Sequence, residues 1–157
     1  MKFSAQEEYG LRCLIAIAAR GEGASMTIPQ ISRDEGLSEP HVAKLLAALR
    51  KEGFINSARG HAGGYTLARS ADTINVGHVL EALGGKLFEE DFCERHSGTN
   101  DICTHSVACG IKALWSTVQG AVDNVLRDVT LADLLPKAVL APVTFFAEPR
   151  RIGGTIR

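Results

Sequence analysis

Three cysteines close together in the chain are the residues best suited to chemistry. Cys93, Cys103 and Cys109 are separated by nine and five residues, in a stretch without any sustained hydrophobic period. A helical pattern follows Cys109, and the dipole at a helix N-terminus favours an anionic sulfur. Three thiolates in such a loop can hold a soft metal centre.

Other uses of these cysteines stay open. The spacing lacks the close Cys-x2-Cys pairs of structural zinc sites, but zinc bound by the three cysteines and His96 or His105 fits the same residues. Thiols used for redox sensing, or thiols without a function, are the remaining alternatives. The fourth cysteine, Cys13, lies on an apolar helix face, where a free cysteine usually packs as a small hydrophobe.

A second group of residues has the pattern of a DNA-binding surface. A polar stripe lies opposite the apolar face of a predicted helix over 38–53, and its members are Ser38, Glu39, His41, Lys44 and Lys51. Polar groups in the N-terminal half of a helix can enter a major groove. Arg59, Gly60 and His61 belong to a glycine-rich turn, and a basic turn of this kind fits a narrow minor groove. A solvated helix face is the alternative explanation of the stripe.

Three helices are predicted before this turn. Apolar residues at i, i+3 and i+4 spacing indicate a first helix over 4–19 with Ser4 as its N-cap. Thr27 is expected to cap a short second helix that Gly36 ends. The third helix buries Val42, Leu45, Leu46 and Leu49. Two such helices joined by a short turn with glycine form a helix-turn-helix unit.

A hairpin completes this unit. Strands are expected over 54–57 and 65–68, and the three glycines of the loop over 58–64 are expected to supply positive backbone dihedrals. Another helix over 73–83 is closed by Gly84 and Gly85. Helices followed by a hairpin predict a winged helix, a mainly α fold with a small β-hairpin wing.

The strongest helical stripe lies near the end of the chain. Its apolar residues are Ile111, Leu114, Trp115, Val118, Val122, Val125, Leu126 and Val129. A helix over 108–129 is about 33 Å long at about 1.5 Å per residue. One small winged helix cannot cover this stripe, so we expect a second copy of the chain to pack on it. Thr130 is expected to cap a short turn, and a flexible tail occupies 136–157.

Several of these strings resemble one family. MKFSAQEEYGLRCL, LSEPHVAKLLAALRKEGFINSARGHAGGYTLAR, CGIKALW and TLADLL resemble the Rrf-type family of bacterial winged-helix regulators. The resemblance runs from Met1 to about Leu135 and implies a homodimer whose two winged helices bind a pseudo-palindromic double-stranded DNA operator. It places base contacts at Pro40, Ala43 and Lys44. Arg59 matches the arginine that enters the minor groove.

The resemblance also implies an iron-sulfur cluster, either 2Fe-2S or 4Fe-4S. In this family the cysteine loop carries the cluster, which assigns Cys93, Cys103 and Cys109 as ligands. Some relatives place a histidine ligand where this chain has Lys112. A nitric-oxide-sensing branch instead uses a carboxylate near the N-terminus of the partner subunit, and Glu8 occupies the matching position. His105 is the other candidate for the fourth ligand.

Composition and charge limit the possible functions. The 157 residues include 17 basic and 18 acidic side chains, so no global basic field exists. The charge is uneven, because residues 27–70 hold six basic and four acidic side chains. The longest nearly apolar run, over 13–19, is too short to span a membrane, and we expect a cytoplasmic protein without a membrane partner. No catalytic triad or phosphate loop is indicated, so we expect no enzyme.

These patterns predict four consecutive parts: a winged helix-turn-helix domain over 1–85, a cysteine-containing loop over 86–109, a dimerisation helix and turn over 110–135, and the tail over 136–157. The predicted function is a homodimeric transcriptional regulator, a repressor, whose operator affinity depends on a cluster that senses redox state, nitric oxide or iron supply. Two alternatives are a regulator of the same fold that uses thiols or an effector without a cluster, and a metal or iron-sulfur carrier that does not bind DNA.

Overall fold

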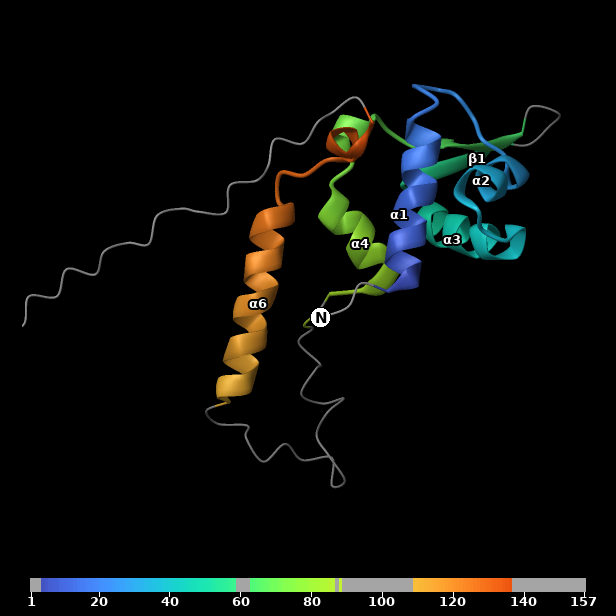
Figure 1. Ribbon diagram of the computed structural model, residues 1–157. Coiled ribbons are helices and arrows are strands. Elements are labelled where there is room, and N and C mark those ends of the chain that lie inside the picture. Colours follow the sequence, from blue (N-terminus) through green and yellow to red (C-terminus); the bar gives the residue numbers. More distant parts are fainter. Residues whose placement is uncertain (1–3, 59–62, 87, 89–108, 137–157) are drawn as a thin grey trace, which may run out of the picture.

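The computed structural model describes residues 4–58, 63–86, 88 and 109–136. The helices are α1 (Ala5–Ala18), α2 (Ile28–Glu35), α3 (Glu39–Lys51), α4 (Val76–Gly84) and α6 (Gly110–Leu126). The strands are β1 (Ile55–Ala58) and β2 (Gly64–Leu67), and the 3-10 turns are η1 (Ala71–Thr73) and η2 (Leu131–Leu134). Helices α1 to α4, the hairpin and η2 form a head, beside which α6 stands (Figure 1). The head is the winged helix that the sequence predicts.

Local signals in the sequence fix where the first two helices begin. Ser4 and Glu7 form a capping box, in which the Glu7 N–H donates to Ser4 Oγ at 3.2 Å and the Ser4 N–H donates to Glu7 Oε2 at 2.6 Å. The Thr27 N–H donates to Gln30 Oε1 at 2.8 Å before α2. Gly36 ends α2 with a φ of 67°, which glycine adopts without strain.

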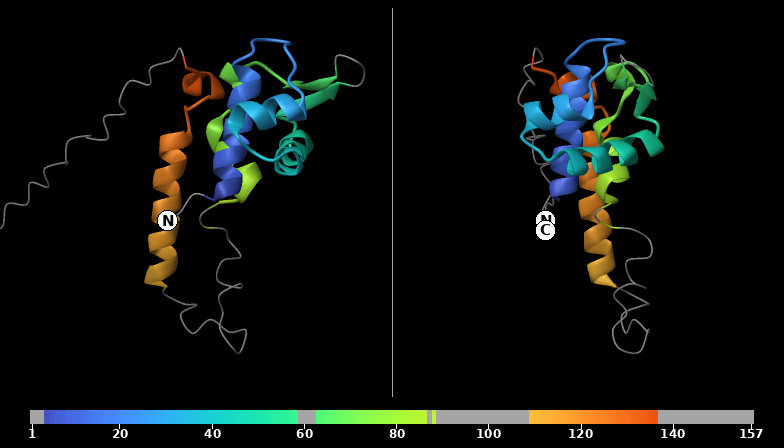
Figure 2. Two further views of the ribbon diagram at one scale, coloured as in Figure 1. Left: turned by 45° about the vertical axis from the view of Figure 1, so that its right-hand side comes forward. Right: turned by 90° about the vertical axis from the view of Figure 1, so that its right-hand side faces the viewer.

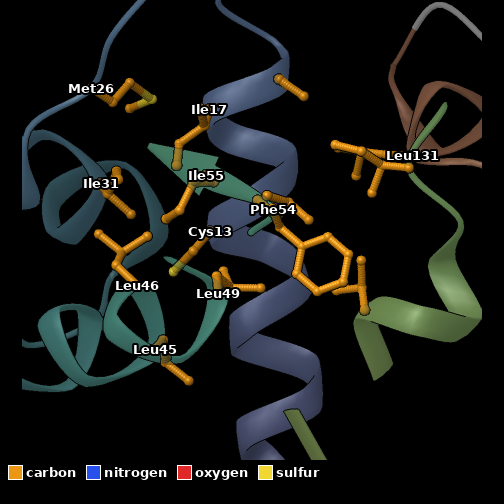
Figure 3. Close-up of a cluster of buried hydrophobic side chains, with 14 of the residues drawn as sticks. Cys13, Ile17, Met26, Ile31, Leu45, Leu46, Leu49, Phe54, Ile55 and Leu131 are labelled. Atoms are coloured by element: carbon orange, nitrogen blue, oxygen red, sulfur yellow. The ribbon is translucent and has the colours of Figure 1, made fainter. Parts of the chain in front are cut away.

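The core of the head surrounds α1. Figure 3 shows Cys13 and Ile17 of α1 among side chains from α2, α3 and β1. The largest side chains buried to a relative exposure below 2% are Leu14, Ile17, Met26, Ile31, Leu45, Leu46, Leu49, Ile55, Ile74, Leu131, Val42 and Val79. Each large aliphatic side chain buried in this way stabilises the fold by about 1.5–3 kcal/mol. Leu131 comes from η2, so the chain returns to the core of the head after α6.

The hairpin lies one residue nearer its tip than predicted. Ile55 pairs with Leu67 and Ala58 with Gly64 in an antiparallel register, whereas Phe54 is buried in the core. Met26 bridges Tyr65 through two backbone hydrogen bonds of 3.0 and 2.8 Å. Gly64 does not have the predicted positive φ. A Cβ there would lie 2.8 Å from the Met26 carbonyl oxygen, so close backbone approach is what requires glycine.

Helix α4 begins later than predicted. The expected start at Thr73 is wrong, because η1 and Ile74 precede the helix and the Ile74 carbonyl accepts the Leu131 N–H at 2.8 Å. Asn75 is the N-cap of α4, and its side-chain oxygen accepts the His78 N–H at 3.2 Å. Gly85 ends α4 with a φ of 79°, as predicted.

Helix α6 is shorter than predicted and lies largely outside the core. Its 17 residues span about 26 Å rather than the expected 33 Å. The helix ends before Val129, because the Val129 carbonyl accepts the Val76 N–H at 2.9 Å in a bridge to the start of α4. No residue of α6 is buried, and Ile111, Leu114, Trp115 and Val125 are 40–58% exposed. None of the described helices is long and apolar enough to cross a bilayer. Apart from Pro136, the predicted flexible tail lies outside the described residues.

Candidate nucleic-acid interface and cysteine site

The exposed side of α3 and the adjoining hairpin form one continuous side of the head, which we call the reading face. In the views of Figures 1 and 2 this face lies on the side of the head away from α6. Ser38, Pro40 and Lys44 are exposed on it. Ser38 is the N-cap of α3, but its side chain makes no capping hydrogen bond. The Ser38 hydroxyl at this helix N-terminus is therefore available to an anion such as a phosphate.

His41 and Ala43 are less accessible than the other predicted contacts. Both are half-buried, and the His41 ring meets the Tyr9 ring edge-on, with centroids 5.6 Å apart. The sequence pattern places His41 in the polar stripe, but its ring is not free, because it packs against Tyr9 of α1. A role for His41 and Ala43 in DNA binding stays a prediction.

Further contacts join α1 to the helix-turn-helix unit. The Arg12 guanidinium lies 5.7 Å from the Tyr9 ring centroid and donates to Glu35 Oε2 at 2.9 Å. A second bond of 2.8 Å reaches the Glu35 carbonyl at the end of α2. Arg12 therefore satisfies a helix C-terminus and fixes α2 against α1.

Sequence periodicity missed one residue of the reading face. Arg50, in the last turn of α3, donates to Ser57 Oγ on β1 at 3.3 Å. This contact connects α3 to strand β1 of the hairpin. The reversal of the chain at Gly53, with a φ of 73°, brings the two residues together, and no repeat in the sequence relates them. The predicted wing-tip contacts Arg59, Gly60 and His61 lie outside the described residues.

Cys109 lies at the N-terminus of α6. Its Sγ accepts the Lys112 N–H at 3.3 Å, and the residue is half-buried. The sulfur therefore faces a backbone donor at the N-terminus of a helix, a position that fits a metal-bound sulfur. Cys93, Cys103, His96 and His105 lie outside the described residues. Within the described ranges, no three His, Cys, Asp or Glu side chains converge on a possible metal site.

The two glutamates near the start of α1 differ in their surroundings. Glu7 is half-buried, forms the capping box with Ser4 and packs where a Cβ on Gly84 would lie 2.5 Å from its Cδ atom. Glu8 is exposed. Glu8 is therefore accessible to a ligand, whereas Glu7 is engaged in the fold.

Comparison with known proteins identifies the family of the chain. The family model described as "Rrf2: Iron-dependent Transcriptional regulator" matches residues 3–137. The chain belongs to the Rrf2 family. This is a family of transcriptional regulators and not of enzymes.

Individual members of the Rrf2 family match over most of their length. Protein rrf2 of Nitratidesulfovibrio vulgaris is 34% identical over 142 residues, which cover 90% of this chain and 92% of that protein. The structure of IscR from T. potens has a TM-score of 0.66 and 32% identity, covering 88% of each chain. The structure of CymR, the global cysteine regulator of B. subtilis, has a TM-score of 0.64 and 28% identity, covering 85% of this chain and 95% of that one.

Cys13 of this Rrf2-family chain is part of the core, as predicted. Its side chain is fully buried, and burial raises the pKa of the thiol from 9.0 to about 11. Burial is the largest cause of this rise in the pKa, the Glu35 carboxylate adds to it, and the Arg12 guanidinium opposes it. The thiol is therefore protonated at neutral pH and packs as a small hydrophobic side chain in the core.

The raised pKa of Cys13 makes stability depend on pH. The unfolded thiol ionises near pH 9 and the folded thiol near 11, so the stabilisation is fully present below pH 9 and is lost as the pH rises to 11. Over this window, the unfolding free energy of the wild type should fall by about 2 kcal/mol relative to that of Cys13→Ala. Urea titrations of both proteins at pH 8, 9, 10 and 11 measure this difference. A difference that stays constant with pH contradicts the assignment.

Proposed function

We propose that this Rrf2-family chain is a homodimeric repressor whose affinity for operator DNA depends on an iron-sulfur cluster. The observation that carries the proposal is the placement of two exposed surfaces. Helix α3 and the hairpin lie on one side of the head and α6 stands on the other side (Figure 2). Helix α6 carries the exposed apolar residues Ile111, Leu114, Trp115 and Val125. One surface is suited to DNA and the other to a second copy of the chain. A dimer that covers an operator blocks access to it, which is the simplest mode of repression.

The proposed DNA contacts follow from the reading face. Helix α3 enters the major groove with Ser38, Pro40 and Lys44, and Ala43 and His41 line its half-buried edge. The wing tip carries Arg59, Gly60 and His61 to the minor groove. A regulator of the chromosome acts in the bacterial cytoplasm, where we place this protein.

The exposed side chains of α6 support self-association. The large hydrophobic residues that are exposed in the described ranges are Ile111, Leu114, Trp115 and Val125, and all belong to α6. A continuous apolar stripe of this size is unusual on a monomer and marks an interface. A two-fold axis would place the same stripe of a second α6 against it, which buries both surfaces at once.

The cluster proposal is supported by the chemistry of Cys109 and by the family description, which calls the family iron-dependent. Cys93, Cys103 and Cys109 would hold the cluster, of the 2Fe-2S or 4Fe-4S type. The fourth ligand would be Glu8 of the partner subunit, or His105. When bound, such a cluster supplies sensitivity to oxidants, nitric oxide and iron supply.

A cluster-free regulator is the second candidate function. The similarity to CymR, which is named as a cysteine regulator, favours this alternative, in which thiols or a small effector change the DNA affinity. Both candidates use the same reading face and the same dimer. They differ in what the cysteine loop binds.

The first prediction from the proposed function concerns the DNA contacts. Wild-type protein should select from a random duplex pool a pseudo-palindrome with two half-sites. Arg59→Ala should weaken binding to this duplex and to unrelated DNA by similar factors, because a wing arginine contributes mainly electrostatic attraction. Lys44→Ala should cost about 1–3 kcal/mol on the selected duplex and change the preferred base.

Fluorescence anisotropy measures these affinities, with Lys86→Ala as the control. Lys86 pairs with Glu81 at 3.4 Å next to the end of α4, away from α3, so its removal should leave DNA binding unchanged. Unchanged affinity in Arg59→Ala argues against a DNA contact by the wing.

The second prediction concerns the dimer. Leu114→Asp or Val125→Asp should convert the dimer to a monomer, because the charge would be buried at the interface. These side chains are 56% and 40% exposed in one chain, so the head should still fold. Ala113→Asp places the same charge on the opposite side of α6 and should remain dimeric. Light scattering distinguishes a mass of 16.8 kDa from twice that value, and dimeric Leu114→Asp and Val125→Asp variants place the interface elsewhere.

The third prediction concerns the cluster. Anaerobically purified wild type should contain iron and acid-labile sulfide and absorb visible light, whereas Cys93→Ala, Cys103→Ala and Cys109→Ala should be colourless. Cys13→Ala is the matched control and should keep its colour, because that thiol is buried in the core. Loss of the cluster should change operator affinity by roughly 5- to 150-fold.

Two results would revise the ligand set. Glu8→Ala protein that keeps its iron and sulfide shows that this carboxylate is not required, and His105→Ala then tests the other ligand. Wild type that stays colourless after anaerobic reconstitution, and binds DNA equally with and without oxidants, contradicts both the cluster and thiol sensing.

A further inference from the structure

Asn75 joins the ends of two helices that belong to different surfaces of the molecule. We propose that the Asn75 side chain is the latch that fixes the angle of α6 to the head, and thereby sets the distance between the two reading faces of the dimer. This inference rests on the proposed function, since the distance matters only for a dimer that binds two half-sites.

The bonds of Asn75 use both ends of its amide. The side-chain oxygen accepts the His78 N–H and caps α4. The side-chain nitrogen shares its two hydrogens among three carbonyl oxygens, those of Leu126 and Arg127 at 2.9 Å each and that of Val129 at 3.2 Å. Leu126 is the last residue of α6 and the other two follow it. The Leu126 carbonyl also accepts the Val129 N–H at 3.3 Å. One amide therefore satisfies the N-terminus of α4 and the C-terminus of α6 together.

The backbone around Asn75 reinforces the same junction. Asn75 and Thr130 form an isolated antiparallel bridge, in which the Val76 N–H donates to the Val129 carbonyl at 2.9 Å. The positive end of the α4 dipole thus meets the negative end of the α6 dipole, which is a favourable arrangement. Beyond this point the chain is anchored, because Leu131 is fully buried in the head.

Among the described residues, α6 packs only loosely on the head away from the Asn75 junction. No residue of α6 is buried, and a cleft of about 580 Å³ separates its inner side from α4, with His78, Val122 and Gln119 in its walls. The Phe88 N–H donates to Gln119 Oε1 at 3.1 Å across this region, from the chain that follows α4. The close approach of α6 to α4 is at Gly77, where a Cβ would lie 3.2 Å from Leu126 Cβ.

A small rotation at the latch has a large effect at the far end of α6. For a helix of about 26 Å, a rotation of about 20° moves the opposite end by about 9 Å. Half-sites of an operator are about 34–36 Å apart per helical turn, so this displacement changes which spacing the dimer can bind. Asn75 is therefore a positioning residue for operator recognition, although it lies away from the reading face.

Asn75→Asp separates the two roles of the amide. A carboxylate still accepts the His78 N–H and keeps the cap of α4, but it cannot donate to the three carbonyls and repels them. Asn124→Asp is the matched control, because it adds the same charge to an exposed site on α6 and keeps the oxygen that accepts from Arg127. Gly77→Ala is a second variant that leaves the Asn75 amide in place. Its methyl group would lie 3.2 Å from Leu126 Cβ and 3.0 Å from Asn75 Oδ1, so it presses on the same junction, while the change from glycine favours helix formation in α4.

The experiment measures binding to duplexes that carry one half-site, or two half-sites at the selected spacing and at spacings changed by two and five base pairs. Wild type and Asn124→Asp should lose at least about tenfold in affinity when the spacing changes by half a turn, about five base pairs. Asn75→Asp and Gly77→Ala should bind a single half-site like wild type, but lose less than about threefold across the same series. A purely structural role would weaken all duplexes equally and leave the spacing dependence unchanged.

The outcomes separate the latch from the function on which it rests. Wild type that binds no DNA overturns the proposed function and the latch with it. Wild type with a clear spacing preference that Asn75→Asp retains, or that Gly77→Ala retains where Asn75→Asp does not fold, overturns the latch alone. Loss of the preference in the variants, with half-site affinity and dimer mass preserved, supports it.

Discussion

Burial of one face of α1 is the constraint on which the other elements depend. Helices α2, α3 and α4, strand β2 and the turn η2 all pack against α1, and Cys13, Leu14 and Ile17 are buried at their common centre. Packing is tight enough that a Cβ on Gly10 would lie 2.6 Å from a methyl carbon of Leu83. Because dense cores transmit displacements, a change in the position of α1 has to move its neighbours.

The same constraint determines which charges remain available on the surface. Arg12 and Arg20 pair with Glu35 and Asp34 of α2, each at 2.9 Å, and Arg69 lies over the Phe54 ring. The charges of these side chains are engaged by contacts within the head. In the described part of the chain, Lys44 is exposed on the reading face and belongs to none of the ion pairs. The net charge of −1 therefore does not exclude the proposed DNA contact at Lys44.

The sequence predicts the bounds of a helix correctly where neighbouring residues determine them, and less accurately where a segment distant in the chain determines them. The caps at Ser4 and Thr27, and the glycines that end α2 and α4, act within one turn of the chain, and all were predicted correctly. The start of α4 and the end of α6 were misplaced for one common reason. Asn75 and Thr130 pair across more than fifty residues, and neither residue carries a periodic signal of that pairing.

The predictions for the candidate site also succeed for local features and fail for contacts between distant segments. Exposure of Ser38, Pro40 and Lys44 follows from helical periodicity, because the opposite face of α3 is apolar. The contact of His41 with Tyr9 and that of Arg50 with Ser57 depend on how helices and strands pack, which a single helix pattern does not contain. The spacing of the three cysteines indicates a metal site, whereas the iron-sulfur cluster and its Glu8 ligand are implied by resemblance. Of these residues, only Cys109 and Glu8 lie among the described residues.

The burial of Leu131 has a consequence for how the protein is made. The core of the head includes a side chain that leaves the ribosome only after the whole of α6, so the first 85 residues emerge without one of their own core residues. Deleting a buried leucine side chain typically costs about 2–5 kcal/mol. During synthesis, the DNA-binding unit therefore reaches full stability only once the helix proposed to pair with a second chain has also been completed. Truncated products that end before η2 are expected to be substrates for proteolysis rather than single heads that compete for operators.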